Sequence, residues 1–259
     1  MEVKIIGAGL AGSEAALQLA KRGFKVKLYE MRPKKTTGAH VGKDCAEFVC
    51  SNSLGSIDVT NASGLLKKEM QILGSELIEI AIKNSVPAGN ALAIAREDFS
   101  KEVTDLIEQN PNIELIREEI TEIPDGNVII ASGPLTSDIF AEKLKEFTKS
   151  EHLHFFDAIA PIVEIDSINF DKAFWGARYD KGEASYINCP MNKEEYENFY
   201  NILINSPRIE QHQVDKNSKY FESCLPVEVL ASRGVDTLRF GPMKPIGKQD
   251  SKYLEFLST

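Results

Sequence analysis

The sequence predicts an α/β protein whose N-terminal half is a parallel sheet covered by helices, followed by a smaller mixed α+β part. Three observations lead to this fold class. Residues 3–29 alternate strand, helix and strand around three glycines, and Val128–Ile130 predicts a further strand that ends in a glycine turn. Beyond about Ser150 the pattern changes to short strands and loops around one clear helix. Because strands that alternate with helices favour a parallel sheet, we expect one domain over residues 1–150 and a second over residues 151–259.

The first strand, Val3–Ile6, runs into a short glycine-rich segment that opens a helix. Residues 13–22 carry alanine and leucine at helical spacing, and Gly23 is placed to end that helix. A second strand, Lys25–Tyr29, follows and ends at Glu30. Strand, glycines, helix, strand and acid therefore occur in the order of a Rossmann-like dinucleotide-binding unit.

Each glycine of this segment has a separate physical role. Gly7 permits the tight turn from strand to helix, Gly9 lets the backbone approach a pyrophosphate, and Gly12 lets the helix pack closely on the strand. The pyrophosphate would lie at the helix N-terminus, and Glu30 would hold ribose hydroxyls. The alternative is a glycine-rich turn that binds nothing. The predicted binding residues here are Gly7, Ala8, Gly9, Leu10, Ala11, Gly12 and Glu30.

The rest of the first half predicts alternating loops, helices and strands. The polar stretch Met31–Asp58 indicates loops, and residues 64–83 indicate one helix with Leu65, Leu66, Met70, Leu73 and Leu77 on one side. A helix over 99–109 ends at Asn110-Pro111.

Two further strands and a helix complete the predicted first domain. The strands are Ile113–Ile116 and Val128–Ile130, and the second of these runs into Ala131-Ser132-Gly133. A strand that ends in Ala-Ser/Thr-Gly is typical of flavoproteins with two dinucleotide-binding domains, where the glycine lets the backbone pass close to the cofactor. Residues 136–149 show helical spacing.

The second half predicts short strands at Phe155-Phe156, Ile162–Ile165 and Tyr186-Ile187. One helix begins at Asn192, where Glu195 is placed for a capping box, and it is expected to bury Tyr196, Phe199, Tyr200 and Leu203. Trp175 is expected in the core. We interpret this half as a substrate-side domain.

Composition narrows the class of protein. The chain has 259 residues, of which 42% are hydrophobic and 27% charged, as in a soluble globular protein. No apolar run approaches the roughly 18 residues of a membrane helix, and no signal peptide precedes the first strand, so we expect a cytoplasmic protein without membrane contact. The net charge of −9 argues against nucleic-acid binding, although a local basic patch would escape this argument.

The four cysteines are Cys45, Cys50, Cys189 and Cys224. They form no disulfide framework and have no zinc spacing, so each is a candidate for chemistry or for plain burial. Cys45 and Cys50 have the C-x₄-C spacing of flavin disulfide reductases, but the residues between them lack the glycines found there. A flavin disulfide-type oxidoreductase is therefore one alternative function.

A series of segments along nearly the whole chain resembles the bacterial folate- and FAD-dependent tRNA (uracil-5-)-methyltransferase family. The segments are residues 7–16, 29–33, 48–54, 86–89, 132–137, 156–163, 178–182, 186–191 and 239–245. The resemblance implies FAD as cofactor, methylenetetrahydrofolate as carbon donor, and reduced nicotinamide, NADH or NADPH, as electron source. It implies a uridine in the tRNA T-loop as target, and a related enzyme type modifies ribosomal RNA instead. The oligomeric state is not predicted.

The resemblance also implies site residues. Gly133 would let the backbone approach the flavin, and Arg32 would bind the adenosine or phosphate side of FAD, or else form a surface salt bridge. The remaining polar positions either contact the substrate or are solvated charges. They are His40, Arg178, Lys181 and Lys244. No metal site is predicted.

The family has two functional cysteines, and their motifs map onto Cys50 and Cys224. Uracil C5 is a poor nucleophile until a thiolate adds to C6, after which C5 can take a one-carbon unit, a base removes the C5 proton and reduced flavin supplies hydride. We assign Cys224 as the C6 nucleophile and Cys50 as the thiol beside the flavin, with the reverse assignment open. Cys189 is interpreted as structural, and the family pattern has no cysteine at Cys45.

The chain departs from the family pattern in two places. The family continues beyond Gly241–Gly247 into a segment that returns to the first domain, whereas this sequence stops after residues 248–259. We therefore expect an incomplete flavin site, in a natural short form or in the product of a longer gene, and an inactive nucleotide-binding remnant is a further alternative. Gly55 stands where the family pattern favours arginine.

Overall fold

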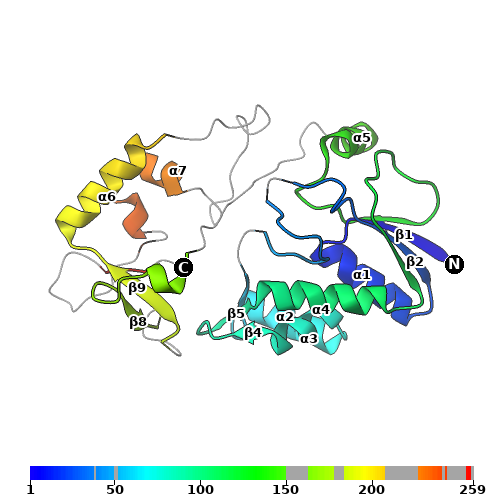
Figure 1. Cartoon of the computed structure of the whole chain (residues 1–259), viewed down its shortest axis with the longest axis horizontal. Helices are drawn as coiled ribbons and strands as arrows, with labels where there is room; N and C mark the ends of the chain where they lie inside the picture. Colours follow the sequence, from blue (N-terminus) through cyan, green and yellow to red (C-terminus); the bar gives the residue numbers. More distant parts are fainter. Residues whose placement is uncertain are drawn as a thin grey trace. The chain divides into compact units, whose positions relative to one another are not determined.

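A computed structural model describes residues 1–37, 39–49, 52–149, 163–177, 184–207, 227–240, 243 and 255–257 (Figure 1). The chain divides into two compact units, Met1–Val86 with Ala91–Ile159 and Pro87–Asn90 with Ala160–Thr259. The domain limits 1–150 and 151–259 remain our proposal, and the observed grouping differs from them by assigning residues 87–90 to the second unit and residues 151–159 to the first.

A four-stranded parallel sheet lies at the centre of the first unit. Its strand order is β6-β2-β1-β7, formed by β1 (Glu2–Ile6), β2 (Lys25–Tyr29), β6 (Ile113–Ile116) and β7 (Val128–Ile130). Ile5 pairs with Leu28 on one side and Ile129 on the other, and both Ile5 and Leu28 are fully buried. All four strands were predicted from the sequence, and the parallel sheet confirms the α/β class.

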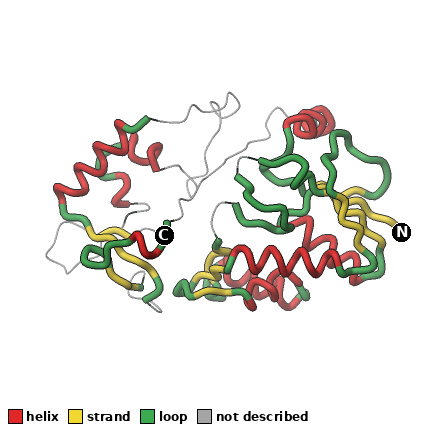
Figure 2. Tube along the Cα trace, viewed as in Figure 1, coloured by secondary structure: helices red, strands yellow, loops and turns green. Residues whose placement is uncertain are grey.

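Helices accompany the strands of this sheet (Figure 2), and helical residues bury its apolar side chains. The helix α1 (Leu10–Lys21) connects β1 to β2, α4 (Arg96–Glu108) precedes β6, and α5 (Asp138–Thr148) follows β7. Each of the three was predicted within a few residues of its observed ends. The core joins the sheet to α1, α3 (Glu76–Lys83) and α4 through Leu17, Ile80, Phe99, Val103 and Ile107.

The single helix predicted over residues 64–83 is wrong, because the structure has two helices there. They are α2 (Ala62–Ile72) and α3, separated by a turn in which Gly74 has φ +79°. Glu14 on α1 receives hydrogen bonds from the Ser75 hydroxyl (2.8 Å) and from the Leu77 N–H (2.9 Å), which anchors the start of α3. This anchor buries Leu77, whereas Leu73 remains 78% exposed.

A small antiparallel sheet in the first unit was missed by the sequence analysis. Its order is β3-β5-β4, formed by β3 (Ser53–Ser56), β5 (Ala91–Ile94) and β4 (Ser85–Val86). The strand β3 lies inside the stretch expected to be loop. These strands are two to four residues long, and β3 has no apolar alternation that would identify it.

The second unit contains an antiparallel sheet with the order β10-β9-β8. Its strands are β8 (Phe174–Gly176), β9 (Tyr186–Pro190) and β10 (Glu255–Leu257). The strand at 186–187 is thus confirmed. Of the segment Ile162–Ile165, which was expected to be a strand, the described residues 163–164 belong to no strand, and the 3₁₀ helix η1 (Ile165–Ser167) follows them. Phe155-Phe156 lies outside the described residues.

The helix predicted at Asn192 is confirmed as α6 (Lys193–Asn205), with the expected capping box. The Asn192 side chain accepts from the Glu195 N–H (3.0 Å), and the Glu195 carboxylate accepts from the Asn192 N–H (2.8 Å). Helix α6 packs Tyr196 against Ala231 of α7 (Val227–Ser232) and Leu238 of the 3₁₀ helix η5 (Thr237–Phe240). Phe199, Tyr200 and Leu203 are partly buried against the same cluster.

Trp175 was expected in the core, and this expectation is wrong. The indole is 50% exposed on β8 and stacks on Phe170, with the ring centroids 5.9 Å apart. The small core around Tyr196 is formed from α6, α7 and η5, so it does not need the indole. Across the described parts of the chain, no helix has both the length and the apolar composition needed to span a membrane.

Candidate functional site: the glycine-rich turn and its cavity

The three glycines of the first turn meet different surroundings, as their predicted roles require. Gly7 has φ +97°, and a Cβ there would lie 2.6 Å from the Ala131 carbonyl oxygen. At Gly12 a Cβ would lie 1.8 Å from the Gly7 carbonyl oxygen, so only glycine lets α1 start this close to β1. At Gly9 a Cβ would meet nothing within 4 Å. Gly7 and Gly12 are therefore needed by the fold, and Gly9 leaves open space beside the backbone.

The N-terminus of α1 faces this open space with unpaired backbone donors. The first intrahelical bond runs from the Ser13 N–H to the Gly9 carbonyl (2.9 Å), so the N–H groups of Leu10, Ala11 and Gly12 have no partner within the helix. Gly9 is the N-cap and has no side chain to cap them, and the first turn contains no acid. Such a terminus favours an anion, because the helix dipole and the free N–H groups both point at it.

Glu30 lies at the carboxyl end of β2, buried next to this terminus. One carboxylate oxygen, Oε2, accepts from the Ala8 N–H (3.1 Å), and the other, Oε1, accepts from the backbone N–H (3.1 Å) and the Nε (3.0 Å) of Arg32. Burial by itself would raise the pKa of the Glu30 carboxyl, but the hydrogen bonds and charge of Arg32, with the Ala8 N–H, hold that pKa below its ordinary value. Glu30 is therefore an anion at neutral pH.

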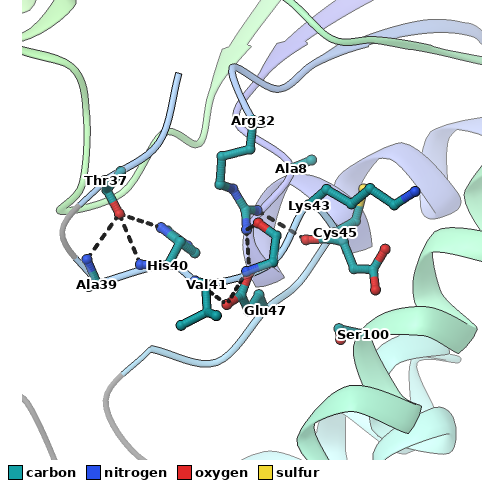
Figure 3. A network of polar contacts seen from close by, with 12 residues as sticks. Ala8, Arg32, Thr37, Ala39, His40, Val41, Lys43, Cys45, Glu47 and Ser100 are labelled. Atoms are coloured by element: carbon teal, nitrogen blue, oxygen red, sulfur yellow. Dashed lines mark hydrogen bonds and ion pairs between the residues drawn. The ribbon is translucent and has the colours of Figure 1, made fainter. Parts of the chain in front are cut away.

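Arg32 is buried at the centre of a polar network, with 1% of its surface exposed (Figure 3). Besides Glu30 it pairs with Glu47, whose Oε2 lies 2.6 Å from Nη1. It also donates to the carbonyl oxygens of Gly42 (3.3 Å) and Asp44 (3.1 Å). The surface salt bridge considered for Arg32 is wrong, because the ion pairs are buried and hold the loop around residues 42–47 to the end of β2.

The same loop contacts the glycine-rich turn directly. The Ala46 N–H donates to the Ala8 carbonyl (2.8 Å), and the Glu47 carboxylate accepts from the N–H groups of Val41 (2.9 Å) and Gly42 (3.1 Å). Nearby, the Thr37 hydroxyl oxygen lies 2.8 Å from Nδ1 of His40 (Figure 3). Glu47 therefore organises the loop on two sides, through Arg32 and through the loop backbone.

These groups surround a cavity of about 310 Å³, a volume at the lower end of the range of small-molecule sites. It brings together most of the predicted cofactor residues, namely Gly7, Gly9, Leu10, Ala11, Glu30, Arg32 and Gly133, and His40 as well. Ala8 and Gly12 do not line it. Its remaining wall includes Glu118 and Glu119 after β6 and the segment Ser132–Ser137 with Phe140 of α5.

Comparison of the sequence with protein-family models identifies the family of this chain. The model of the family described as glucose inhibited division protein A matches residues 2–255. The chain belongs to the glucose inhibited division protein A family.

Curated relatives of this family member are similar over almost all of its length. A protein of Persephonella marina is 54% identical over 253 residues, which are 97% of this chain and 58% of that protein. One of Fusobacterium nucleatum is 58% identical over 247 residues, which are 95% of this chain and 57% of that protein. Both are named methylenetetrahydrofolate–tRNA-(uracil-5-)-methyltransferase TrmFO, which confirms the resemblance seen in the motifs. The chain spans between half and two thirds of the length of these relatives.

Solved structures of the glucose inhibited division protein A family are more distant. The structure of Aquifex aeolicus GidA in its form I crystal matches with a TM-score of 0.41 and 18% sequence identity. The match covers 51% of this chain and 25% of that one.

In this member of the glucose inhibited division protein A family, the two cysteines that the structure describes differ sharply. Cys45 belongs to the loop around residues 42–47 and is fully buried in the core, and burial raises the pKa of its thiol to about 11. Cys189 is exposed on β9. A thiol with such a high pKa is a poor nucleophile, which argues against the disulfide-type reaction of Cys45 with Cys50.

Several predicted residues of this family member lie outside the described residues: Cys50, Cys224, Arg178, Lys181 and Lys244. Within the parts of the chain that the structure describes, no group of three or more His, Cys, Asp or Glu side chains is placed to hold a metal ion.

Sequence reasoning missed two features of this site. Glu47 is not among the residues singled out from the sequence, although its carboxylate holds both Arg32 and the loop backbone. Glu119 lines the cavity and pairs with Lys35 (2.7 Å). The available signal for Glu47 was an arginine with two glutamates near it in the sequence. Their spacing does not show which glutamate folds back onto the guanidinium.

Proposed function

We propose that the first unit binds FAD in the cavity at the glycine-rich turn, and that the chain acts in the enzymatic methylation of uracil C5 in tRNA. The observation that carries the proposal is the uncapped N-terminus of α1, which opens on a cavity where the Glu30 carboxylate also lies. An anion beside the helix and a hydroxylated sugar beside the acid are the two recognition elements of a dinucleotide.

The residues present fit FAD at this position. The N–H groups of Leu10 and Ala11 would bind the pyrophosphate, since no side chain at Gly9 stands between them and the cavity. Glu30 would accept from the ribose, and Gly133, with φ +66°, would pass its backbone close to the cofactor. Arg32 would act through Glu30 and the loop. When bound, FAD supplies the redox chemistry that reduces the transferred one-carbon unit to a methyl group.

The proposed substrates follow from the names of the relatives, which give methylenetetrahydrofolate and the uracil of tRNA. A reduced nicotinamide is the proposed electron source, and the cytoplasm the proposed location. Cys224 is proposed to add to uracil C6 and Cys50 to act beside the flavin in removing the C5 proton, on the basis of their motifs. Each of these thiols must be ionised to react. The buried thiol of Cys45 does not meet this condition, because burial raises its pKa.

The first test of this function is flavin binding. The purified chain is titrated with FAD, and quenching of flavin fluorescence and the visible absorbance of the bound flavin are recorded. Saturable binding supports the proposal. A protein that stays colourless and quenches no flavin fluorescence would refute FAD binding by this chain.

The second test concerns the uracil chemistry. The chain is incubated with reduced FAD, methylenetetrahydrofolate and T-loop RNA that contains 5-fluorouracil, in which fluorine replaces the proton that must leave C5. We expect a covalent protein–RNA adduct that Cys224→Ala abolishes and Cys189→Ala retains. A ribosomal RNA fragment with the same base tests the other target. Flavin binding without any adduct would leave the dinucleotide site standing and refute the uracil reaction in this chain.

A further inference from the structure

We propose that this site selects a dinucleotide whose adenosine ribose has a free 2′-hydroxyl and rejects one with a 2′-phosphate, and that Glu47 is the specificity-determining residue. The inference rests on the proposed dinucleotide function. It goes further because it states which dinucleotides the site excludes and which side chain outside the glycine-rich turn excludes them.

The Glu30 carboxylate has little remaining capacity to accept hydrogen bonds. A carboxylate oxygen accepts about two hydrogen bonds. Oε1 already accepts two, from the backbone N–H and the Nε of Arg32, and Oε2 accepts one from Ala8. One acceptor position on Oε2 is left, next to the cavity that Glu30 lines. It suits a hydroxyl, which can donate a proton, and it repels a phosphate, which is an acceptor with the same sign of charge.

Arg32 is withdrawn from any ligand by Glu47 together with Glu30 and two loop carbonyls. In dinucleotide-binding folds, an arginine near the ribose accommodates a 2′-phosphate, and Arg32 stands two residues after the acid, where it could take that role. Its Nε, Nη1 and Nη2 instead donate to Glu30, Glu47, Gly42 and Asp44. Four of its five N–H groups are used in this way. The guanidinium therefore stabilises the loop and has no pair of donors to offer a phosphate.

The charges that line the cavity also oppose a 2′-phosphate. The net charge of Glu30, Glu47 and Arg32 together is −1. Glu118 and Glu119 add two acids to the wall, of which Glu119 pairs with Lys35. His40 is the other basic side chain among the described residues of the wall. The Thr37 hydroxyl oxygen accepts from the N–H groups of Ala39 and His40 and lies 2.8 Å from Nδ1 of the His40 ring.

The consequence concerns FAD and NADPH, one of the two nicotinamides proposed as electron source. FAD has no phosphate on its ribose 2′-oxygen, whereas NADPH does. A site that rejects the 2′-phosphate would keep NADPH from competing with FAD for the glycine-rich turn. As electron donor, NADPH would then have to reach the flavin without occupying this site.

The test compares ADP-ribose with its 2′-phosphorylated form by isothermal titration of the purified chain. The two probes share the pyrophosphate and differ only at the 2′-oxygen. We expect ADP-ribose to bind about tenfold more tightly or better, because like charges brought together in an interface cost several kcal/mol. Equal affinity, or tighter binding of the 2′-phosphate, would overturn the inference while FAD binding still stood. Binding of neither probe, with no FAD binding, would overturn the proposed function and the inference together.

A variant tests the role assigned to Glu47. Glu47→Gln keeps one oxygen that can accept from Arg32, places an amide NH2 where the other carboxylate oxygen accepts from the loop N–H groups, and removes the charge, so the preference for ADP-ribose should fall by about threefold or more. Glu69→Gln, an exposed position on α2 away from the cavity, makes the same change in net charge and should leave the ratio unchanged. An unchanged ratio in Glu47→Gln would refute its role. The wild-type comparison needs no variant, and it decides the inference if Glu47→Gln does not fold.

Discussion

Two alanine substitutions in the glycine-rich turn should separate folding from binding. Gly12→Ala should destabilise the fold, and Gly9→Ala should weaken FAD binding. Gly12→Ala places a Cβ 1.8 Å from the Gly7 carbonyl oxygen and 3.4 Å from the Ala131 Cβ. The first contact is with backbone, so α1 and the end of β1 must move apart. Gly9→Ala places its Cβ in open space, at a residue with φ −71° and ψ −168°, an extended conformation that any residue adopts.

The magnitudes follow from these contacts. Overpacking of a core costs typically 1–3 kcal/mol, and a backbone clash this short should cost about 3 kcal/mol or more, offset by about 1 kcal/mol from the better helix propensity of alanine. Gly9→Ala should change the free energy of unfolding by less than about 1 kcal/mol, because it strains nothing. The same methyl group would occupy the space in which a pyrophosphate approaches the N–H groups of Leu10 and Ala11, so FAD affinity should fall about tenfold or more.

Urea unfolding followed by circular dichroism measures the first effect, and quenching of flavin fluorescence measures the second. We expect Gly12→Ala to lower the urea midpoint clearly and Gly9→Ala to leave it near wild type while weakening FAD binding. A wild-type midpoint in Gly12→Ala would contradict the close packing of α1 on β1. Wild-type FAD affinity in Gly9→Ala would contradict a pyrophosphate at this turn.

Four further outcomes are expected. Iodoacetamide at pH 8 should alkylate the exposed Cys189 and leave Cys45 unmodified until the chain is unfolded, as peptide mass spectrometry can show, because burial raises the Cys45 pKa to about 11. Arg32→Met should destabilise the first unit by about 3–5 kcal/mol in urea unfolding, since two buried carboxylates lose their cation. Because the Glu30 pKa is lowered on folding, its stabilising contribution is complete above its ordinary value of 4.5 and is lost as pH falls through the folded value, so Glu30→Gln should flatten the acid limb of a stability–pH profile. Asn192→Ala should cost about 1 kcal/mol in the unfolding of the second unit, which contains α6.

Local patterns predicted the elements whose signals lie within a few residues. The four parallel strands, helix α1 with its stop near Gly23, and the capping box of α6 were all predicted, because turns, caps and apolar periodicity act over one or two helical turns. The α2–α3 region was not. Its apolar residues continue at helical spacing through Gly74, and the break depends on Glu14, some sixty positions earlier, which binds Ser75 and the first N–H groups of α3.

The candidate site divides in the same way. The sequence by itself determined the glycine-rich turn, the acid at Glu30 and the family, because the spacing of glycines along one strand–helix turn is a local property. Only the tertiary structure decided the fate of Arg32 and Cys45. Arg32 is buried because the chain returns beneath Ala8 and brings Glu47 to the guanidinium, and Cys45 is covered in the core beside Thr104 of α4. Both outcomes depend on contacts between segments distant along the chain, whose pairing no spacing within the sequence specifies.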